Sequence, residues 1–294
     1  MPKKLLRLRS HRWLSQIFKL STRQHPVTTN KLVYLFGLKR SGLHALSFWL
    51  LGHCTSNMLV NNSPAKRRGN ASRMMRTIRT SPLPTIINQG DQIATYRNQH
   101  EYFEPLPAAV DLSVVLFQSQ SLPYLAAQPA LTDGIIATTS YQVLLLRDPF
   151  NWAASYLHKS QHPEAYLIWP DLWREYVNEF VGNTHYLGDT VKVNYNCWFT
   201  DASYRQQISA QLGLTFTDEA LEVVTAHAGG SSFDQTQFNA SAQQMSVMNR
   251  WQHYQHEPQY REAFQKNQDI LNLGMQLFDL PPDLQTFAQQ CRAA

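Results

Sequence analysis

The chain has 294 residues, 43% of them hydrophobic, and a formal net charge of +5 with histidine neutral. This length and composition suit one α/β domain with a full core and a peripheral extension better than two independent domains. Three widely spaced cysteines, Cys54, Cys197 and Cys291, give neither a metal spacing nor an even disulfide set, which predicts a reducing, cytoplasmic compartment. No metal-ligand pattern and no fingerprint of an RNA-binding module are present, so neither a metal nor a nucleic-acid partner is expected.

The amino-terminal segment alternates cations with apolar residues and lacks the uninterrupted apolar run that a signal peptide or membrane span requires. We predict a basic amphipathic segment at 1–29, followed by a single domain at 30–294. Such a helix can make peripheral contact with an anionic membrane surface, or it can pack on the domain or fray as a tail.

Residues 32–51 predict a buried strand, a turn bounded by Gly37 and Gly42, and a helix. A turn of this kind brings backbone N–H groups and the amino-terminal end of the helix to one point, where the helix dipole also favours an anion. Lys39 and Arg40 add two side-chain cations at the same place. The sequence therefore predicts a phosphate-binding turn.

The two glycines have the spacing of the phosphate loop of nucleotide triphosphatases, but Leu43 and His44 follow them instead of a lysine and a hydroxyl residue. The hydroxyl normally holds magnesium, and phosphoryl transfer relies on that ion to neutralise charge. The turn therefore suits an anionic nucleotide that is handled without a metal.

The stretch at 61–100 combines turn formers and cations with few apolar residues, which predicts a mobile basic insertion that covers the acceptor site. Candidate general bases in and around this region are His53, His100, Glu101 and Glu104. Glu104 lies in a polar-aromatic stretch suited to line an acceptor pocket, although a solvated loop carboxylate is an alternative interpretation. The next apolar strand, at 113–118, ends without a carboxylate.

A second strand, turn and helix are predicted over residues 141–159. Arg147 stands at the carboxyl end of the strand, and Ser155 follows about two helical turns later. Ligands of open α/β sheets bind at this end of the strands, which makes both residues candidate ligand contacts. Alternatively, Arg147 and Asp148 form a local ion pair that caps the helix.

The remaining chain predicts a later strand and helix at 191–214, a polar loop at 229–234, and helices from residue 257 to the end. The order of elements is strand-helix, insertion, strand, strand-helix, helices, strand-helix and helices. That order predicts a doubly wound parallel sheet with flanking helices.

Taken together, the segment Arg40-Ser41-Gly42 and the segment Arg147-Asp148-Pro149 with Ser155 resemble the two nucleotide motifs of the sulfotransferase superfamily. That superfamily uses 3′-phosphoadenosine 5′-phosphosulfate. The resemblance implies that the first motif binds the 5′-phosphosulfate and the second binds the 3′-phosphate. It covers about residues 30 to 260 and looks closest to bacterial sulfotransferase-like proteins with a P-loop-type fold.

Segment 229–234 and the Met248-Asn-Arg-Trp251 segment resemble the family's Ser-Phe loop and the basic-aromatic segment that closes over the nucleotide. The resemblance therefore implies donor contacts along the whole chain. The implied donor-binding residues are Lys39, Arg40, Ser41, Gly42, Leu43, His44, Arg147, Ser155, Arg250 and Trp251.

The chain departs from the family where Leu43, His44 and Ala45 replace two hydroxyl residues and, relative to the cytosolic enzymes, a tryptophan. His44 can replace one hydroxyl by donating a ring N–H to the anion, or it can be a surface residue of the helix. Trp49 is expected in the core. The implied catalytic residues are Arg40 as the charge-stabilising group, His44, and Glu104 as the base.

The sequence thus predicts a sulfotransferase that moves a sulfuryl group to a hydroxyl or amine of a small-molecule, carbohydrate or lipid acceptor. Two alternatives stay open. One is a nucleotide-binding protein without transferase activity, because no base is evident. The other is an ATP-dependent, kinase-like enzyme, which the missing lysine and hydroxyl of the phosphate loop disfavour.

Overall fold

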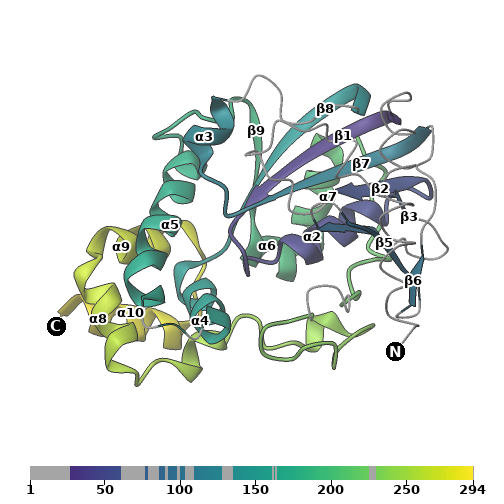
Figure 1. Ribbon diagram of the computed structural model, residues 1–294. Coiled ribbons are helices and arrows are strands. Elements are labelled where there is room, and N and C mark those ends of the chain that lie inside the picture. The colour runs from purple at the N-terminus through teal and green to yellow at the C-terminus, as the bar shows by residue number, and fades with distance from the viewer. Residues whose placement is uncertain are drawn as a thin grey trace, which may run out of the picture.

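A computed structural model gives the fold of the chain (Figure 1). It describes residues 27–60, 77–78, 86–89, 92–97, 100–102, 109–127, 135–160, 162, 164–224 and 230–293. The strands are β1 (Val27–Gly37), β2 (Asn57–Val60), β3 (Thr77–Ile78), β4 (Ile86–Gln89), β5 (Gln92–Arg97), β6 (His100–Tyr102), β7 (Ala109–Gln118), β8 (Ile135–Leu146) and β9 (Thr190–Asn194). Within the described ranges they form a six-stranded sheet, β3-β2-β7-β1-β8-β9, and a three-stranded sheet, β4-β5-β6.

Five strands of the large sheet run parallel, and β3 pairs antiparallel to β2 at one edge. Strand β1 lies in the middle, where Phe36 is in register with Phe117 of β7 and with Leu144 of β8. The chain places β2 and β7 on one side of β1, and then β8 and β9 on the other side. Because the chain switches sides at β1, the carboxyl ends of β1 and β8 border the crevice where such sheets bind ligands.

Helices cover both faces of this sheet, which confirms the predicted doubly wound α/β class. The longer helices are α2 (Leu43–Leu51), α3 (Leu122–Ala126), α4 (Pro149–Ser160), α5 (Ala165–Val181), α6 (Tyr195–Thr200), α7 (Ala202–Gln211), α8 (Pro258–Lys266), α9 (Gln268–Leu277) and α10 (Pro282–Ala293). Two short 3-10 helices, η3 (Ala242–Gln244) and η4 (Arg250–His253), precede α8.

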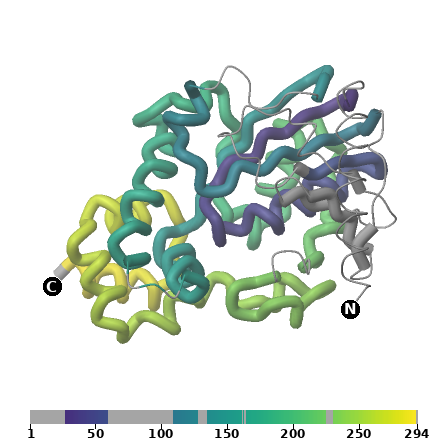
Figure 2. Tube along the Cα trace, in the orientation of Figure 1, coloured from purple at the N-terminus to yellow at the C-terminus, as the bar shows by residue number. Residues whose placement is uncertain are grey.

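The central strands are apolar on both sides, as expected of strands buried between two helical layers. Val33 and Leu35 of β1 face a core that includes α2, α6 and α7. Leu32 and Phe36 face the opposite core, which includes α4, α5 and the carboxyl-terminal helices. In Figure 2 the yellow carboxyl-terminal helices accordingly lie beside the teal α4 and α5. The helical pattern predicted from residue 257 onward is thereby confirmed.

Two predicted segments meet the described structure only in part. Strand β1 begins at Val27, so residues 27–29 of the predicted amino-terminal segment belong to the sheet, and residues 1–26 lie outside the described residues. Where the predicted insertion at 61–100 is described, it forms β3, β4, β5 and the start of β6. Across the described ranges, no helix combines the length and the apolar character needed to cross a bilayer.

Candidate anion-binding site

The turn between β1 and α2 has a backbone shape that its residues make possible. Arg40 and Gly42 both lie in the left-handed region, with φ of 72° and 97°. A Cβ atom on Gly42 would lie 2.1 Å from the ring of Tyr195, so both the backbone angle and the space require glycine. No side chain caps the start of α2. The first N–H groups of the helix are therefore suited to bind an anion.

Neighbouring strands and helices hold this turn in place. The Lys39 N–H donates to Ser119 Oγ (2.9 Å), and the Ser119 N–H donates to the Gly37 carbonyl (2.9 Å), which fastens the turn to the end of β7. On the other side, Trp152 Nε1 of α4 donates to the Lys39 carbonyl (2.8 Å). The hydroxyl of Ser41 donates to a carbonyl inside the turn, at 2.7 Å. The turn is thus preorganised by bonds to two other elements.

Arg147 enters the same place from the carboxyl end of β8 and is 1% exposed. One terminal nitrogen of its guanidinium donates to the Arg40 carbonyl and to Ser155 Oγ, each at 3.3 Å. The other donates to the carbonyl of Val247. Its guanidinium carbon lies 5.0 Å from the ring centre of Tyr195. The side chain of Arg147 therefore joins the turn between β1 and α2 to α4.

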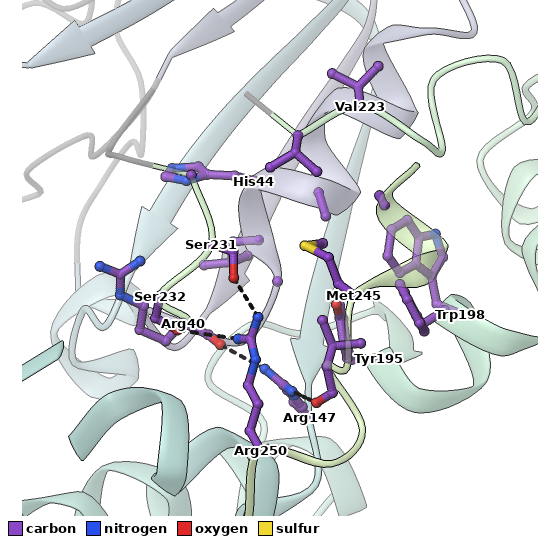
Figure 3. Close-up of a pocket in the computed structure, with 18 of the residues that line it drawn as sticks. Arg40, His44, Arg147, Tyr195, Trp198, Val223, Ser231, Ser232, Met245 and Arg250 are labelled. Carbon is purple, nitrogen blue, oxygen red and sulfur yellow. Dashed lines mark hydrogen bonds between the residues drawn. The ribbon is translucent and has the colours of Figure 1, made fainter. Parts of the chain in front are cut away.

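Arg250, at the start of η4, meets Arg147 at a shared hydroxyl. Its Nη1 donates to Ser155 Oγ (3.0 Å) and to Ser232 Oγ (3.3 Å), and its Nη2 donates to Ser231 Oγ (2.7 Å). The side chain is 6% exposed. Figure 3 shows the bonds from Arg250 to Ser231 and Ser232 and places the ends of the Arg147 and Arg250 side chains close to one another. Ser155 in turn donates its hydroxyl proton to the Asn151 carbonyl (2.8 Å).

The electrostatics of this pair favour a bound anion. Burial, together with the positive charge of Arg147, lowers the pKa of Arg250 to about 10. Asp234 Oδ2 is the nearest carboxylate that bonds Arg250 in the described structure, at 3.5 Å. Nε of Arg147 and Nε of Arg250 are both buried and have no hydrogen-bond partner. Buried cations without a close counter-ion are unfavourable, so an anionic ligand would stabilise them.

A cavity of about 280 Å³ connects the turn to the two arginines. One part of its wall is cationic and comes from the turn, from β8 and from η4. The other part is apolar, with Trp198 and Met245 among its side chains (Figure 3). The cavity thus combines a binding surface for anionic groups with an apolar wall, as a nucleotide requires.

Most of the predicted site residues come together here. Those that line the cavity are Lys39, Arg40, Gly42, Leu43, His44, Arg147 and Arg250. Ser155 does not line the cavity, but its Oγ accepts hydrogen bonds from both Arg147 and Arg250. Burial lowers the pKa of Arg40. His44 lies on the cavity wall with its Nε2 atom 2.9 Å from Gln118 Nε2.

The predicted donor contacts Ser41 and Trp251 do not line the cavity. The Ser41 hydroxyl is buried and bonds within the turn instead. Trp251 is also buried, and its ring packs against Phe287 with the ring centres 5.2 Å apart. A 3-10 helix turns about 120° per residue, so facing Arg250 toward the cavity directs Trp251 into the core. Glu104 lies outside the described residues.

The structure also tests the alternative role of Asp148 as an ion-pair partner of Arg147 and the expected place of Trp49. Asp148 does not act as an ion-pair partner of Arg147; its carboxylate accepts from the N–H of Asn151 (2.7 Å) and caps α4. Trp49 is fully buried, which confirms its expected place in the core, and its Nε1 donates to Asp218 (2.9 Å). The positive charge of Arg147 is therefore not neutralised by Asp148.

Sequence reasoning missed the apolar wall and its most important residue, Tyr195. This residue directly follows β9, so its position at the carboxyl end of a parallel strand was a usable signal. The other apolar wall residues lie on α6, on η3 or on loops, which are too short or too irregular for hydrophobic periodicity to say which way a side chain points. They are Trp198, Phe199, Leu221, Val223, Val224, Ala242, Met245 and Val247.

Comparisons with known proteins add a distant structural likeness. No family profile and no curated protein matches the chain. Among solved structures, the chain is similar to the sulfotransferase domain from the Synechococcus PCC 7002 olefin synthase, with a TM-score of 0.40 and 14% identity. The match covers 57% of this chain and 60% of that domain.

Proposed function

We propose that this chain is a sulfotransferase with 3′-phosphoadenosine 5′-phosphosulfate as the donor. One observation carries the proposal. The buried guanidinium groups of Arg147 and Arg250 both line the cavity and both donate to the hydroxyl of Ser155, and the uncapped start of α2 borders the same cavity. A ligand with two separate anionic groups on one sugar ring and an aromatic base fits that arrangement. The donor nucleotide is such a ligand.

The roles of the residues follow from their positions. Arg147, Ser155 and Arg250 would bind the 3′-phosphate, because two forked cations can hold several phosphate oxygens at once. Lys39, Arg40 and the N–H groups at the start of α2 would bind the 5′-phosphosulfate. Losing a 3′-phosphate contact should chiefly raise the KM for the donor, whereas losing Arg40 should lower kcat.

In the proposed reaction an acceptor oxygen or nitrogen attacks the sulfur atom. The bond between sulfur and the bridging oxygen breaks, the acceptor loses its proton, and adenosine 3′,5′-bisphosphate leaves with the additional negative charge. Arg40 would stabilise that developing charge. Among the described lining residues, His44 alone ordinarily titrates near neutral pH, and it would contact the anion or receive the proton.

The kinase-like alternative lacks a cation at the position of the phosphate-loop lysine. Leu43 occupies that position, is 3% exposed, and packs against Gly37. Its side chain therefore contributes to the core and cannot neutralise a transferred phosphoryl group.

The decisive experiment is a calorimetric titration with adenosine 3′,5′-bisphosphate in EDTA, run beside a titration with ATP and magnesium. We expect the bisphosphate to bind without metal and the Arg147→Ala variant to lose at least about tenfold in affinity, as for a charge-assisted hydrogen bond. Arg174→Ala is the matched control, because Arg174 pairs with Asp171 and Asp269 outside the cavity.

Near-ultraviolet circular dichroism would confirm that both variants fold. A clear preference for magnesium-ATP would contradict the proposal. Binding of the bisphosphate without sulfuryl transfer from the ³⁵S-labelled donor to any acceptor in a broad screen would favour the alternative of a nucleotide-binding protein without transferase activity.

A further inference from the structure

An aromatic and cationic cluster lies beside Arg250, and the roles proposed so far do not use it. The ring of His158 stacks on the ring of Phe233, with the ring centres 4.1 Å apart and the planes at 16°. The His253 ring lies 5.0 Å from the same phenylalanine, and the guanidinium carbon of Arg250 lies 5.1 Å from it. Phe233 thus gathers three groups that can carry positive charge. We call His158, Phe233 and His253 the outer cluster.

The outer cluster continues the face of α4 that holds the two arginines. Residues three and four apart on a helix share one face, which places Asn151, Ser155 and His158 in a row. Asn151 Oδ1 accepts from the Trp251 N–H at 3.3 Å, and Ser155 Oγ accepts from Arg250 at 3.0 Å. His158 then stacks on Phe233. One face of α4 therefore runs from the candidate phosphate site to an exposed histidine.

The charges that act on His158 come from several elements. Burial lowers the pKa of His158, and the positive charges of His253 and Arg250 from η4, of Arg40 from the phosphate-binding turn, and of Lys159 from α4 lower it further. The carboxylate on the Phe233 segment is Asp234, which accepts from Ser231 Oγ (2.9 Å) and from Arg250 (3.5 Å).

On the basis of the proposed function, we propose that His158, one helical turn beyond Ser155 and joined to Arg250 through Phe233, takes up a proton when a phosphate group binds to Arg147 and Arg250. The phosphate brings negative charge into a region where cations oppose the imidazolium form, so its arrival favours protonation. The face of Phe233 stabilises the resulting imidazolium through a cation–π contact. Proton uptake by His158 and donor binding are therefore coupled.

The sign of the effect follows from linkage. In the free protein the pKa of His158 is below the ordinary value of 6.5, and bound anion raises it again. Between those two values the complex holds more protons than the free protein, so affinity increases as the pH falls through this range. The phosphate of the ligand also titrates near pH 6 and opposes the trend, so the measurable quantity is the difference between variants.

The test is calorimetry of adenosine 3′,5′-bisphosphate binding at about pH 6.3, in two buffers with different ionisation enthalpies. The difference between the observed enthalpies gives the number of protons taken up. We expect the wild type to take up several tenths of a proton more than His158→Ala, and to gain about threefold in affinity relative to that variant between pH 8 and pH 6. Ligand titration cancels in this comparison.

The control is His185→Ala, which removes an exposed histidine beyond the carboxyl end of α5 and should match the wild type. Phe233→Leu keeps an apolar side chain but removes the ring, and should lower the proton uptake. If the bisphosphate binds normally and His158→Ala takes up as many protons as the wild type, the coupling is wrong while the donor site stands. If the wild type binds no bisphosphate at any pH, the proposed function fails, and this inference fails with it.

Discussion

Two buried arginine sites, one on α7 and one where the end of β8 meets η4, show how the partners of a cation differ between a structural role and the proposed ligand-binding role. Arg205 of α7 is 4% exposed and donates to both carboxylate oxygens of Asp218 through Nε and Nη2, at 2.9 to 3.1 Å. Its Nη1 donates to the Trp198 carbonyl at 2.8 Å. All three of its nitrogens therefore have partners within the protein.

Arg147 and Arg250 are buried to a similar extent but are partnered differently. Their bonds go to hydroxyls and carbonyls, Nε of each lacks a partner, and Arg250 meets its carboxylate, Asp234, only at 3.5 Å. Two neighbouring positive charges in a low-dielectric site repel each other, which destabilises the site when no anion is bound. The number of hydrogen bonds to a buried arginine therefore does not identify a ligand site. The lack of a close carboxylate partner for its positive charge does.

The largest expected effect breaks the structural pair. Asp218→Asn leaves Arg205 buried with no carboxylate and weakens the bond from Trp49, so the free energy of unfolding should fall by about 3 kcal/mol. Urea unfolding would measure this. The matched control is Asp171→Asn, which removes an exposed carboxylate from Arg174 and should cost less than about 0.5 kcal/mol. Equal losses in the two variants would contradict a structural role for Asp218.

At the candidate site we expect the opposite result, a small change in stability and a large change in ligand affinity. Arg250→Met removes one of two like charges and keeps much of the buried volume, so stability should change by less than about 1 kcal/mol. Affinity for adenosine 3′,5′-bisphosphate should fall by about 10- to 100-fold, because charge-assisted bonds to the phosphate are lost. Calorimetry and urea unfolding on the same preparation give both numbers. A variant that unfolds easily and still binds would place Arg250 in the structural class with Arg205.

How far the sequence could predict this site depends on the kind of element. The turn at 37–42 follows from glycine spacing, because Gly42 needs both a left-handed backbone and an absent side chain. Arg147 follows from its place at the end of an apolar strand, and the parallel sheet from the order of strands and helices. These predictions work because each depends on local backbone geometry.

The rest depends on side-chain direction, which a local pattern does not fix. Arg250 and Trp251 are adjacent in sequence and were both expected at the ligand, yet the 3-10 turn sends one to the cavity and the other to Phe287. Tyr195 packs under the guanidinium of Arg147 because α6 packs against the turn between β1 and α2, where Gly42 lies against the Tyr195 ring. That turn is about 150 residues away in sequence, so no local pattern could predict the contact.

A smaller effect tests the hydroxyl that the two arginines share. Ser155→Ala removes the common acceptor that orients the two guanidinium groups while leaving both cations in place, so bisphosphate affinity should fall by about fivefold to tenfold, or about 1 kcal/mol. Ser209→Ala is the matched control, because that buried hydroxyl bonds His53 Nε2 (3.0 Å) on the other face of the sheet. We expect it to affect stability and not affinity. Unchanged affinity in Ser155→Ala would remove the hydroxyl from the donor site.

The smallest effect is the acid dependence of the structural pair. Burial by itself would raise the pKa of Asp218, but the hydrogen bonds from Arg205 and Trp49 outweigh it, and the pKa lies below the ordinary value of 3.8. The carboxylate therefore binds fewer protons in the folded chain, and its contribution is complete above pH 3.8 and is lost as the pH falls through the lower, folded value. Urea unfolding of the wild type and of Asp218→Asn between pH 5 and about pH 2.5 should show their stability difference shrinking toward the acid end. At the ligand site Arg250 meets its carboxylate, Asp234, only at 3.5 Å, so Arg250→Met should converge much less with the wild type. A constant difference for Asp218→Asn would mean that the side chain acts through packing and not through its charge.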